Sequence, residues 1–178
     1  MNLISRRTHL RLAGFATAAA ATGTFPVFGS SLKGTAAHAG ESAQMTNTAQ
    51  MRAVNPAEIN IPNISQAMLI ESGKLLFLSG HVPLRDDGMI AGPALEDQLH
   101  QAFLNLKATL RAAGADFTNV ARMTIYVRGL SRDDLSIIRA VRDRHIDHRR
   151  PPASALIGVA ELYDPNVRVE IDAIAAVP

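Results

Sequence analysis

The sequence predicts an α+β protein in which two helices pack on one face of a mixed β-sheet. Residues 95–113 repeat apolar side chains at helical spacing, and residues 167–173 alternate apolar and charged side chains as a half-buried strand does. A second helical segment begins after residue 130 and cannot continue past Pro151-Pro152. With the shorter β-type runs, the expected order is β-β-(β)-α-β-α-β-β, which leaves the second face of the sheet to be covered by something else.

The first two expected strands are short and close together in the sequence. They cover residues 68–70 and 74–79, and we expect them to pair across residues 71–73. Residues 75–78, Leu-Leu-Phe-Leu, are apolar on both faces, which indicates a central strand that is covered on both sides. A further short run follows over residues 89–91.

The two expected helices have recognisable ends. In the first helix, over residues 95–113, acidic side chains stand in the first turn, and Gly114 follows the last turn, where glycine forms a left-handed cap. Its apolar stripe fits packing on a sheet and requires no cofactor. The second helix opens at residues 131–134, Ser-Arg-Asp-Asp, which resemble a capping box with Asp in place of Glu.

Three strands are expected in the C-terminal half, over residues 122–127, 155–160 and 167–173. Turn residues at 163–166 separate the last two strands. In the last strand Arg168, Glu170 and Asp172 stand on one face, opposite an apolar face. The pattern alone favours a charged face in solvent.

Residues 1–39 have the features of an export signal. Arg6 and Arg7 precede a mildly apolar stretch at residues 12–21, and residues 37–39, Ala-His-Ala, supply a cleavage site of the small-x-small type. This arrangement is typical of a twin-arginine signal peptide and predicts a periplasmic or extracellular protein. The apolar stretch is shorter than the roughly 20 residues of a membrane-spanning helix, so we expect no membrane attachment after cleavage. A disordered tail is the alternative interpretation.

Composition restricts the chemistry of the remaining chain, which we divide into a linker at 40–57 and one domain at 58–178. Among the 178 residues there is no cysteine, which removes disulfides, thiolate nucleophiles and cysteine-based zinc sites. Residues 1–39 hold four basic residues and no acidic ones, so the rest, with 14 basic and 16 acidic residues, has a net charge of −2. Such a body gives no electrostatic argument for binding nucleic acid or a membrane.

Five segments form a recognisable series: Ile-Ser-Gln-Ala at 64–67, Leu-Phe-Leu-Ser-Gly through Asp-Asp-Gly at 76–88, a helix–strand unit at 101–127, Pro-Pro-Ala-Ser at 151–154 and Val-Glu-Ile-Asp at 169–172. In this order they resemble the reactive intermediate deaminase family (RidA or YjgF, with the older name endoribonuclease L-PSP). The resemblance extends over about residues 59–177. Ile64 stands where the family usually has a tyrosine.

The resemblance implies a chorismate-mutase-like (YjgF) fold and a homotrimer with ligand pockets between subunits. In deaminating members an arginine after Pro-Ala grips the substrate carboxylate, whereas this chain has Ser154, as in a PPAS-type branch. The glutamate that positions the attacking water matches Glu170, and the Ser-Gly backbone that holds the ligand matches Ser79 and Gly80. His81 follows and is a further candidate to line the pocket, although a histidine in solvent at a strand end is the alternative.

Loss of the pocket arginine matters because a guanidinium binds a carboxylate through two parallel charge-assisted hydrogen bonds. Serine offers one neutral donor, so a 2-imino acid would lose on the order of 100-fold in binding. Arg149 or Arg150, just before the proline pair, is a candidate replacement; the alternative is a solvated helix end whose cations complement the helix dipole. An ion pair with Arg168 is the alternative role of Glu170.

His145 and His148 are a possible metal-binding pair, but they need at least one more ligand, so no metal and no cofactor is expected.

Two functions from different classes are consistent with these residues. The first is a hydrolase that deaminates a small imine or enamine, with Glu170 as the general base on water. The second is a non-catalytic trimer that binds a small metabolite, which Ser154 favours. Ribonuclease activity, suggested by the older family name, is disfavoured because RNA sites combine net positive charge with aromatic platforms, whereas this body is close to neutral and has few aromatic residues.

Overall fold

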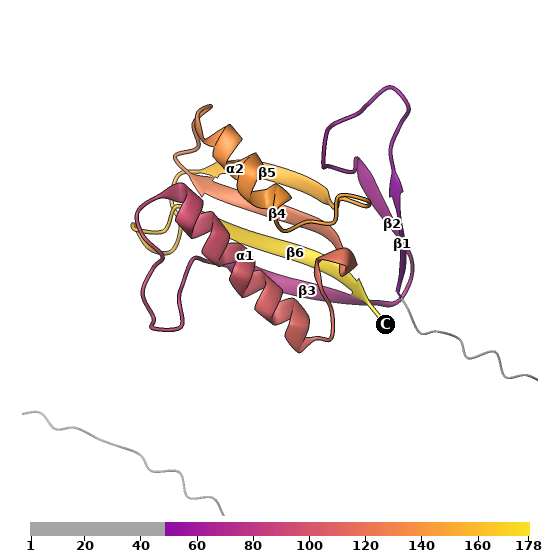
Figure 1. The fold of residues 1–178 in the computed structure, drawn as a ribbon, viewed down its shortest axis with the longest axis horizontal. Coiled ribbons are helices and arrows are strands. Elements are labelled where there is room, and N and C mark those ends of the chain that lie inside the picture. Colours follow the sequence, from indigo (N-terminus) through magenta and orange to yellow (C-terminus); the bar gives the residue numbers. More distant parts are fainter. Residues whose placement is uncertain (1–48) are drawn as a thin grey trace, which may run out of the picture. The chain divides into compact units, whose positions relative to one another are not determined.

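A four-stranded sheet with two helices on one face forms the larger part of the chain that the structure describes, residues 49–178 of a computed structural model (Figure 1). In chain order the elements are β1 Gln50–Val54, β2 Ala67–Ser72, β3 Lys74–His81, α1 Leu95–Ala112, the 3-10 helix η1 Phe117–Asn119, β4 Val120–Arg128, α2 Asp134–Asp143, β5 Ala153–Val159 and β6 Val169–Val177. Neither described helix is long and apolar enough to cross a membrane. The predicted signal peptide lies outside the described residues.

The sheet is mixed, as the sequence predicted, and its strand order is β3-β6-β4-β5. β6 pairs antiparallel with both β3 and β4, whereas β4 and β5 are parallel and are connected through α2. A parallel pair needs such a crossover, because the chain must return to the edge from which the first strand began. The two helices cover the same face, and Figure 1 shows both in front of the sheet.

The core lies between the helices and this face. Alternate residues of the two central strands are buried, and Met123 and Ile125 of β4 and Ile171 of β6 are at most 1% exposed. They join Leu99 and Phe103 of α1 in one buried cluster. The alternation over residues 167–173 therefore gives one face to the core, and Glu170 lies on the other, open face.

The expected pairing of the first two strands is wrong. β2 pairs antiparallel with β1, which occupies part of the predicted linker, and the two form a separate two-stranded sheet. β3 pairs with β6 instead. Gly73, with a φ of +111°, is the single residue between β2 and β3, and glycine adopts this backbone conformation without a steric penalty. The linker prediction is corrected at residues 50–54.

β3 is an edge strand of the larger sheet, so the prediction of a central, doubly covered strand is also wrong. Leu76 and Leu78 turn toward the core, but Leu75 is 53% and Phe77 71% exposed. Both faces of this strand are therefore apolar, as the sequence indicated, but a single chain covers only one of them.

Smaller differences concern the loops and helix ends. The run at residues 89–91 makes only an isolated bridge, between Leu84 and Ile90. Before α2, the carboxylate of Asp134 accepts hydrogen bonds from the backbone N–H and the hydroxyl of Ser131. These bonds, the first and largest cause, lower the pKa of Asp134. The predicted capping box is thus half formed, since the Ser131 hydroxyl donates to the Asp134 carboxylate and does not accept from the backbone N–H of Asp134.

Candidate functional site

Glu170 of β6 lies directly on the backbone of Gly80 in β3. A β-carbon built at position 80 would be 1.7 Å from Oε1 of Glu170 and 2.6 Å from its carboxyl carbon. A side chain at position 80 would therefore occupy the volume of the carboxylate. The register of β3 on β6 also shifts between Leu78 and His81, and this irregularity places Ser79 and Gly80 beside Glu170.

The alternative role of Glu170, an ion pair with Arg168, does not occur. The guanidinium of Arg168 lies 3.4 Å from Oδ1 of Asp134. The backbone N–H of Arg168 donates to the side-chain oxygen of Gln98. No hydrogen bond joins Glu170 to another side chain of residues 49–178. The carboxylate therefore remains available to a ligand or water on the open face.

Tyr126 and Asp172 form a polar pair next to Glu170 on the same face. Tyr126 lies opposite Glu170 in the β4–β6 register, and its hydroxyl donates to Oδ2 of Asp172 at 2.9 Å. That hydrogen bond, then burial and the charge of Asp172, raise the pKa of Tyr126. Thr124, opposite Asp172, has a buried hydroxyl, the only buried side-chain oxygen or nitrogen among the described residues without a hydrogen-bond partner. The open face thus carries several polar groups in one row.

His81 belongs to the other side of the sheet. Its Nδ1 lies 2.7 Å from the carbonyl oxygen of Ser79, and its Nε2 lies 2.8 Å from Oγ1 of Thr109 on α1. Because a carbonyl only accepts, Nδ1 carries a hydrogen and donates it. His81 therefore holds the irregular end of β3 against α1, and its ring is not beside Glu170.

Ser154 of β5 and Ile64 line one small cavity, of about 170 Å³, beneath α2. Its walls include Ile125 of the core and two arginines of α2, Arg139 and Arg142. The residues that match the family's tyrosine and arginine positions therefore line the same cavity. A second cavity, of about 270 Å³, shares Ile64 and both arginines.

The segment before β2 is fixed to the start of β5 by Ser65. Its hydroxyl donates to the carbonyl of Pro151, its backbone N–H donates to the carbonyl of Pro152, and it forms a parallel bridge with Ala153. Ser65 is only 1% exposed. This anchor explains how two segments almost 90 residues apart build one cavity.

Glu170 and Ser154 lie on opposite faces of the same sheet. In the register, Glu170 is opposite Tyr126 on the open face, whereas Ser154 is opposite Met123, which is buried in the core. Met123 and Tyr126 are three positions apart on β4, so their side chains point to opposite faces. A ligand on one face of the sheet of a single chain therefore does not contact both Glu170 and Ser154.

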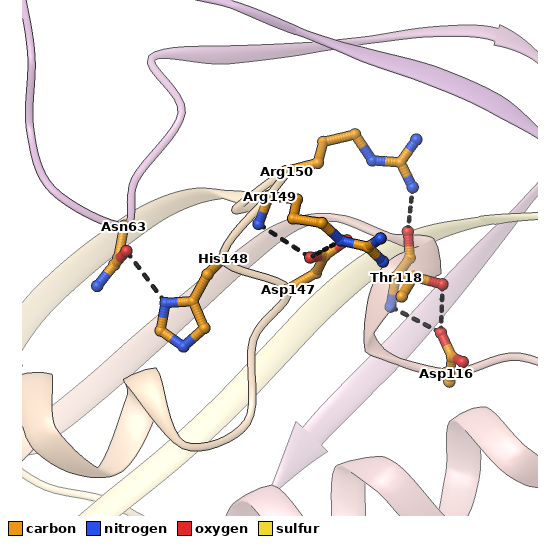
Figure 2. Close-up of polar contacts among 7 residues, drawn as sticks. All are labelled: Asn63, Asp116, Thr118, Asp147, His148, Arg149 and Arg150. Carbon is orange, nitrogen blue, oxygen red and sulfur yellow. Dashed lines mark hydrogen bonds and ion pairs between the residues drawn. The ribbon is translucent and has the colours of Figure 1, made fainter.

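The two arginines predicted to replace the pocket arginine serve other purposes. Arg150 donates to the carbonyl oxygens of Met51 in β1 and Thr118 in η1, and Arg149 pairs with Asp147 at its own loop (Figure 2). Neither residue lines the cavity beside Ser154. Arg150 therefore holds β1 against η1, and its assignment as a ligand-binding residue stays a prediction.

The two histidines of the pair contact different parts of the chain. His148 contacts the side chain of Asn63, as Figure 2 shows, and the carbonyl of Asp143. His145 instead stacks on Phe103, with ring centroids 4.7 Å apart, and contacts His100. Within residues 49–178 no group of three metal-binding side chains gathers.

Sequence reasoning missed Tyr126, Arg139 and Arg142. Arg142 stands one helical turn after the core residue Ile138, a spacing that places it toward the sheet, and this signal was available. Tyr126 could be assigned to the face of Glu170 only from the pairing of β4 with β6.

Comparison with known proteins agrees with this fold. A family model described as endoribonuclease L-PSP matches residues 57–177. The chain is 39% identical over 113 residues to protein DfrA of Myxococcus xanthus, a match that covers 62% of this chain and 82% of the relative. It is 34% identical over 110 residues to the 2-iminobutanoate/2-iminopropanoate deaminase of Dermatophagoides farinae, covering 61% and 82% of the two chains.

A crystal structure of a Rid family protein of unknown function from Yersinia pestis superposes with a TM-score of 0.65 at 33% identity. The superposition covers 71% of this chain and 98% of that one. The family match spans more than half of the sequence, and the matched region contains both the Glu170–Gly80 contact and the Ser154 cavity. The chain therefore belongs to the endoribonuclease L-PSP family, the family of the RidA/YjgF proteins.

Proposed function

We propose that this chain is a hydrolase that deaminates a small imine or enamine at pockets shared between the subunits of a homotrimer. The single observation that carries the proposal is the Glu170 carboxylate, which lies over Gly80 on the open face of the sheet without a side-chain partner among residues 49–178. Relatives from Dermatophagoides farinae and Homo sapiens are named 2-iminobutanoate/2-iminopropanoate deaminases. Glu170 acts as the general base on the water that attacks the carbon of the C=N bond.

The placement of the two halves of the site supports the proposed assembly. Glu170 with Gly80 lies on the open face, and Ser154 with Ile64 lies on the helix face. Apposition of the open face of one subunit with the Ser154 cavity of its neighbour forms a complete pocket, and closed symmetry repeats it. The exposed Leu75 and Phe77 gain cover in the same step.

The proposal also includes export. Arg6 and Arg7, with the apolar stretch after them, support a twin-arginine signal, and the protein then acts outside the cytoplasm.

The test is ammonia release from freshly generated 2-imino acids by the purified protein, with Glu170→Ala and Ser154→Arg in parallel. We expect release by the wild type and a loss of about 100-fold or more in Glu170→Ala, because a general base contributes that much to the rate. Equal rates in the wild type and in Glu170→Ala would refute the assigned role.

A non-catalytic trimer that binds a small metabolite is the second candidate, because Ser154 replaces the family's pocket arginine. Its signature is no release by the wild type but measurable release by Ser154→Arg, which restores the guanidinium on an intact scaffold.

A further inference from the structure

The Ser154 cavity contains positive charge that position 154 itself does not supply. Arg139 and Arg142 of α2 line both this cavity and the adjoining one, together with Ile64. The other walls of the first cavity are aliphatic, from Ile125, Leu135, Ile138 and Leu156. Two guanidinium groups at the end of an apolar slot suit a small carboxylate with a short aliphatic tail.

Arg142 is buried, with a side chain only 8% exposed; it is ion-paired with Asp143, but several of its N–H donors have no partner among the described residues. Its Nε and Nη2 both lie within 2.9 Å of a single oxygen, Oδ1 of Asp143. The second oxygen of Asp143 accepts from the side-chain amide of Asn63 at 2.8 Å. A guanidinium has five N–H donors, so this one keeps capacity for a second acceptor, and a buried cation gains from finding one.

Arg139 stands one helical position after Ile138 and is exposed. Its guanidinium makes no hydrogen bond or ion pair with any residue of the described part of the chain. Arg144 on the same segment is paired with Glu96 across to α1. Arg139 is therefore available to a ligand at the cavity mouth, while Arg142 forms its inner wall.

We propose that Arg139 and Arg142 bind the carboxylate of the substrate in the Ser154 cavity, in place of the arginine that is absent from position 154. The inference rests on the proposed function and deepens it, because it names the residues that select a carboxylate. The cation reaches the cavity from α2 rather than from β5. The small serine at position 154 of β5 then leaves room in the cavity for a guanidinium group from α2.

The experiment measures binding of 2-oxobutanoate, a stable analogue of a 2-imino acid, and of its neutral counterpart 2-oxobutanamide by isothermal titration calorimetry. The variants of the full chain are Arg139→Gln, Arg142→Gln and the double variant. Arg132→Gln is the matched control, because Arg132 lies just before α2 and lines neither cavity. Thermal melting of each variant checks folding, and the exposed Arg139 supplies a variant that keeps the core intact.

We expect each arginine variant to weaken 2-oxobutanoate binding at least about tenfold, the double variant to weaken it further, and amide binding to stay unchanged. Arg132→Gln should bind both ligands as the wild type does. Unchanged carboxylate affinity in Arg139→Gln or the double variant, or a wild type that does not bind 2-oxobutanoate, would overturn the inference.

Ammonia release separates this inference from the proposed function. Binding that depends on the arginines without turnover supports the inference and refutes catalysis. Turnover whose KM is insensitive to Arg139→Gln supports catalysis and refutes the inference.

Discussion

The carboxylate of Glu170 occupies the space that a side chain at position 80 would need, so the residue type at position 80 is tightly constrained. The φ of Gly80 is not in the left-handed region, so its backbone tolerates other residues. What it excludes is a β-carbon, which would stand 1.7 Å from Oε1 and 2.9 Å from Cγ of Glu170. The Glu170 side chain can therefore take this position only because residue 80 is a glycine.

Gly80→Ala should move the Glu170 carboxylate while the fold persists. We expect ammonia release to fall by about 100-fold, toward that of Glu170→Ala, because a displaced base loses its contribution to the rate. Overpacking costs about 1–3 kcal/mol of stability, which thermal melting measures. Gly158→Ala is the matched control, because its β-carbon would meet only Leu130, at 3.2 Å. A crystal structure of Gly80→Ala with Glu170 in its original place would contradict the argument.

At the scale of elements, the packing of α1 against the segment after α2 depends on a partly buried histidine. His145 stacks on Phe103 of α1 at an interplanar angle of 6°, and its ring also meets His100. Burial, followed by the positive charges of His100, Lys107 and Arg144, lowers the pKa of His145 to about 4. The contact between the two elements therefore requires the neutral ring.

The stability of the protein should decrease as the pH falls from about 6.5 to about 4. In this range His145 takes up a proton in the unfolded chain but not in the folded one, so its stabilising contribution is complete above the unfolded pKa and is lost as the pH falls through the folded pKa. Since the ring is only partly buried, we expect a loss of about 2 kcal/mol rather than the larger full linkage value.

Denaturant unfolding at several pH values measures this dependence. His145→Phe, which keeps a flat ring on Phe103, should show a smaller slope between pH 4 and 6.5. An unchanged slope in that variant would assign the effect to other groups.

The whole molecule has one face of its sheet protected by helices and one that is largely open. The small β1–β2 sheet covers only one end of the open face, where Met51 packs near Ala176. Phe77 remains 71% exposed there, opposite Ile174 in the β3–β6 register. A large apolar side chain at such a position is typical of a subunit interface.

Phe77→Glu should dissociate the proposed trimer. Each subunit would lose about 1.5–3 kcal/mol of apolar burial and place a charge in the contact. Analytical ultracentrifugation should show a shift toward monomer, and circular dichroism should stay unchanged because Phe77 is not part of the core of one chain. Met89→Glu is the control, since Met89 is 61% exposed but lies outside the sheet strands. A trimer that survives Phe77→Glu would place the interface elsewhere.

The sequence by itself determined the helices, most strands and the identity of Glu170 as the main candidate, because periodicity and motif order are local properties of the chain. It also placed Ser79 and Gly80 near that residue through the family resemblance. The pairing of β1 with β2, the edge position of β3 and the place of Arg139 in the Ser154 cavity were decided only by the tertiary structure.

The physical reason is that alternation assigns faces within one strand but not between strands. Glu170 and Ser154 could be placed on opposite faces only once β6 and β5 were both registered against β4. For the same reason the two-faced apolar run at residues 75–78 gave no indication of which face one chain would cover, since strand partners are chosen by contacts distant in sequence. Local patterns thus predicted the elements, and long-range pairing decided which functional side chains meet.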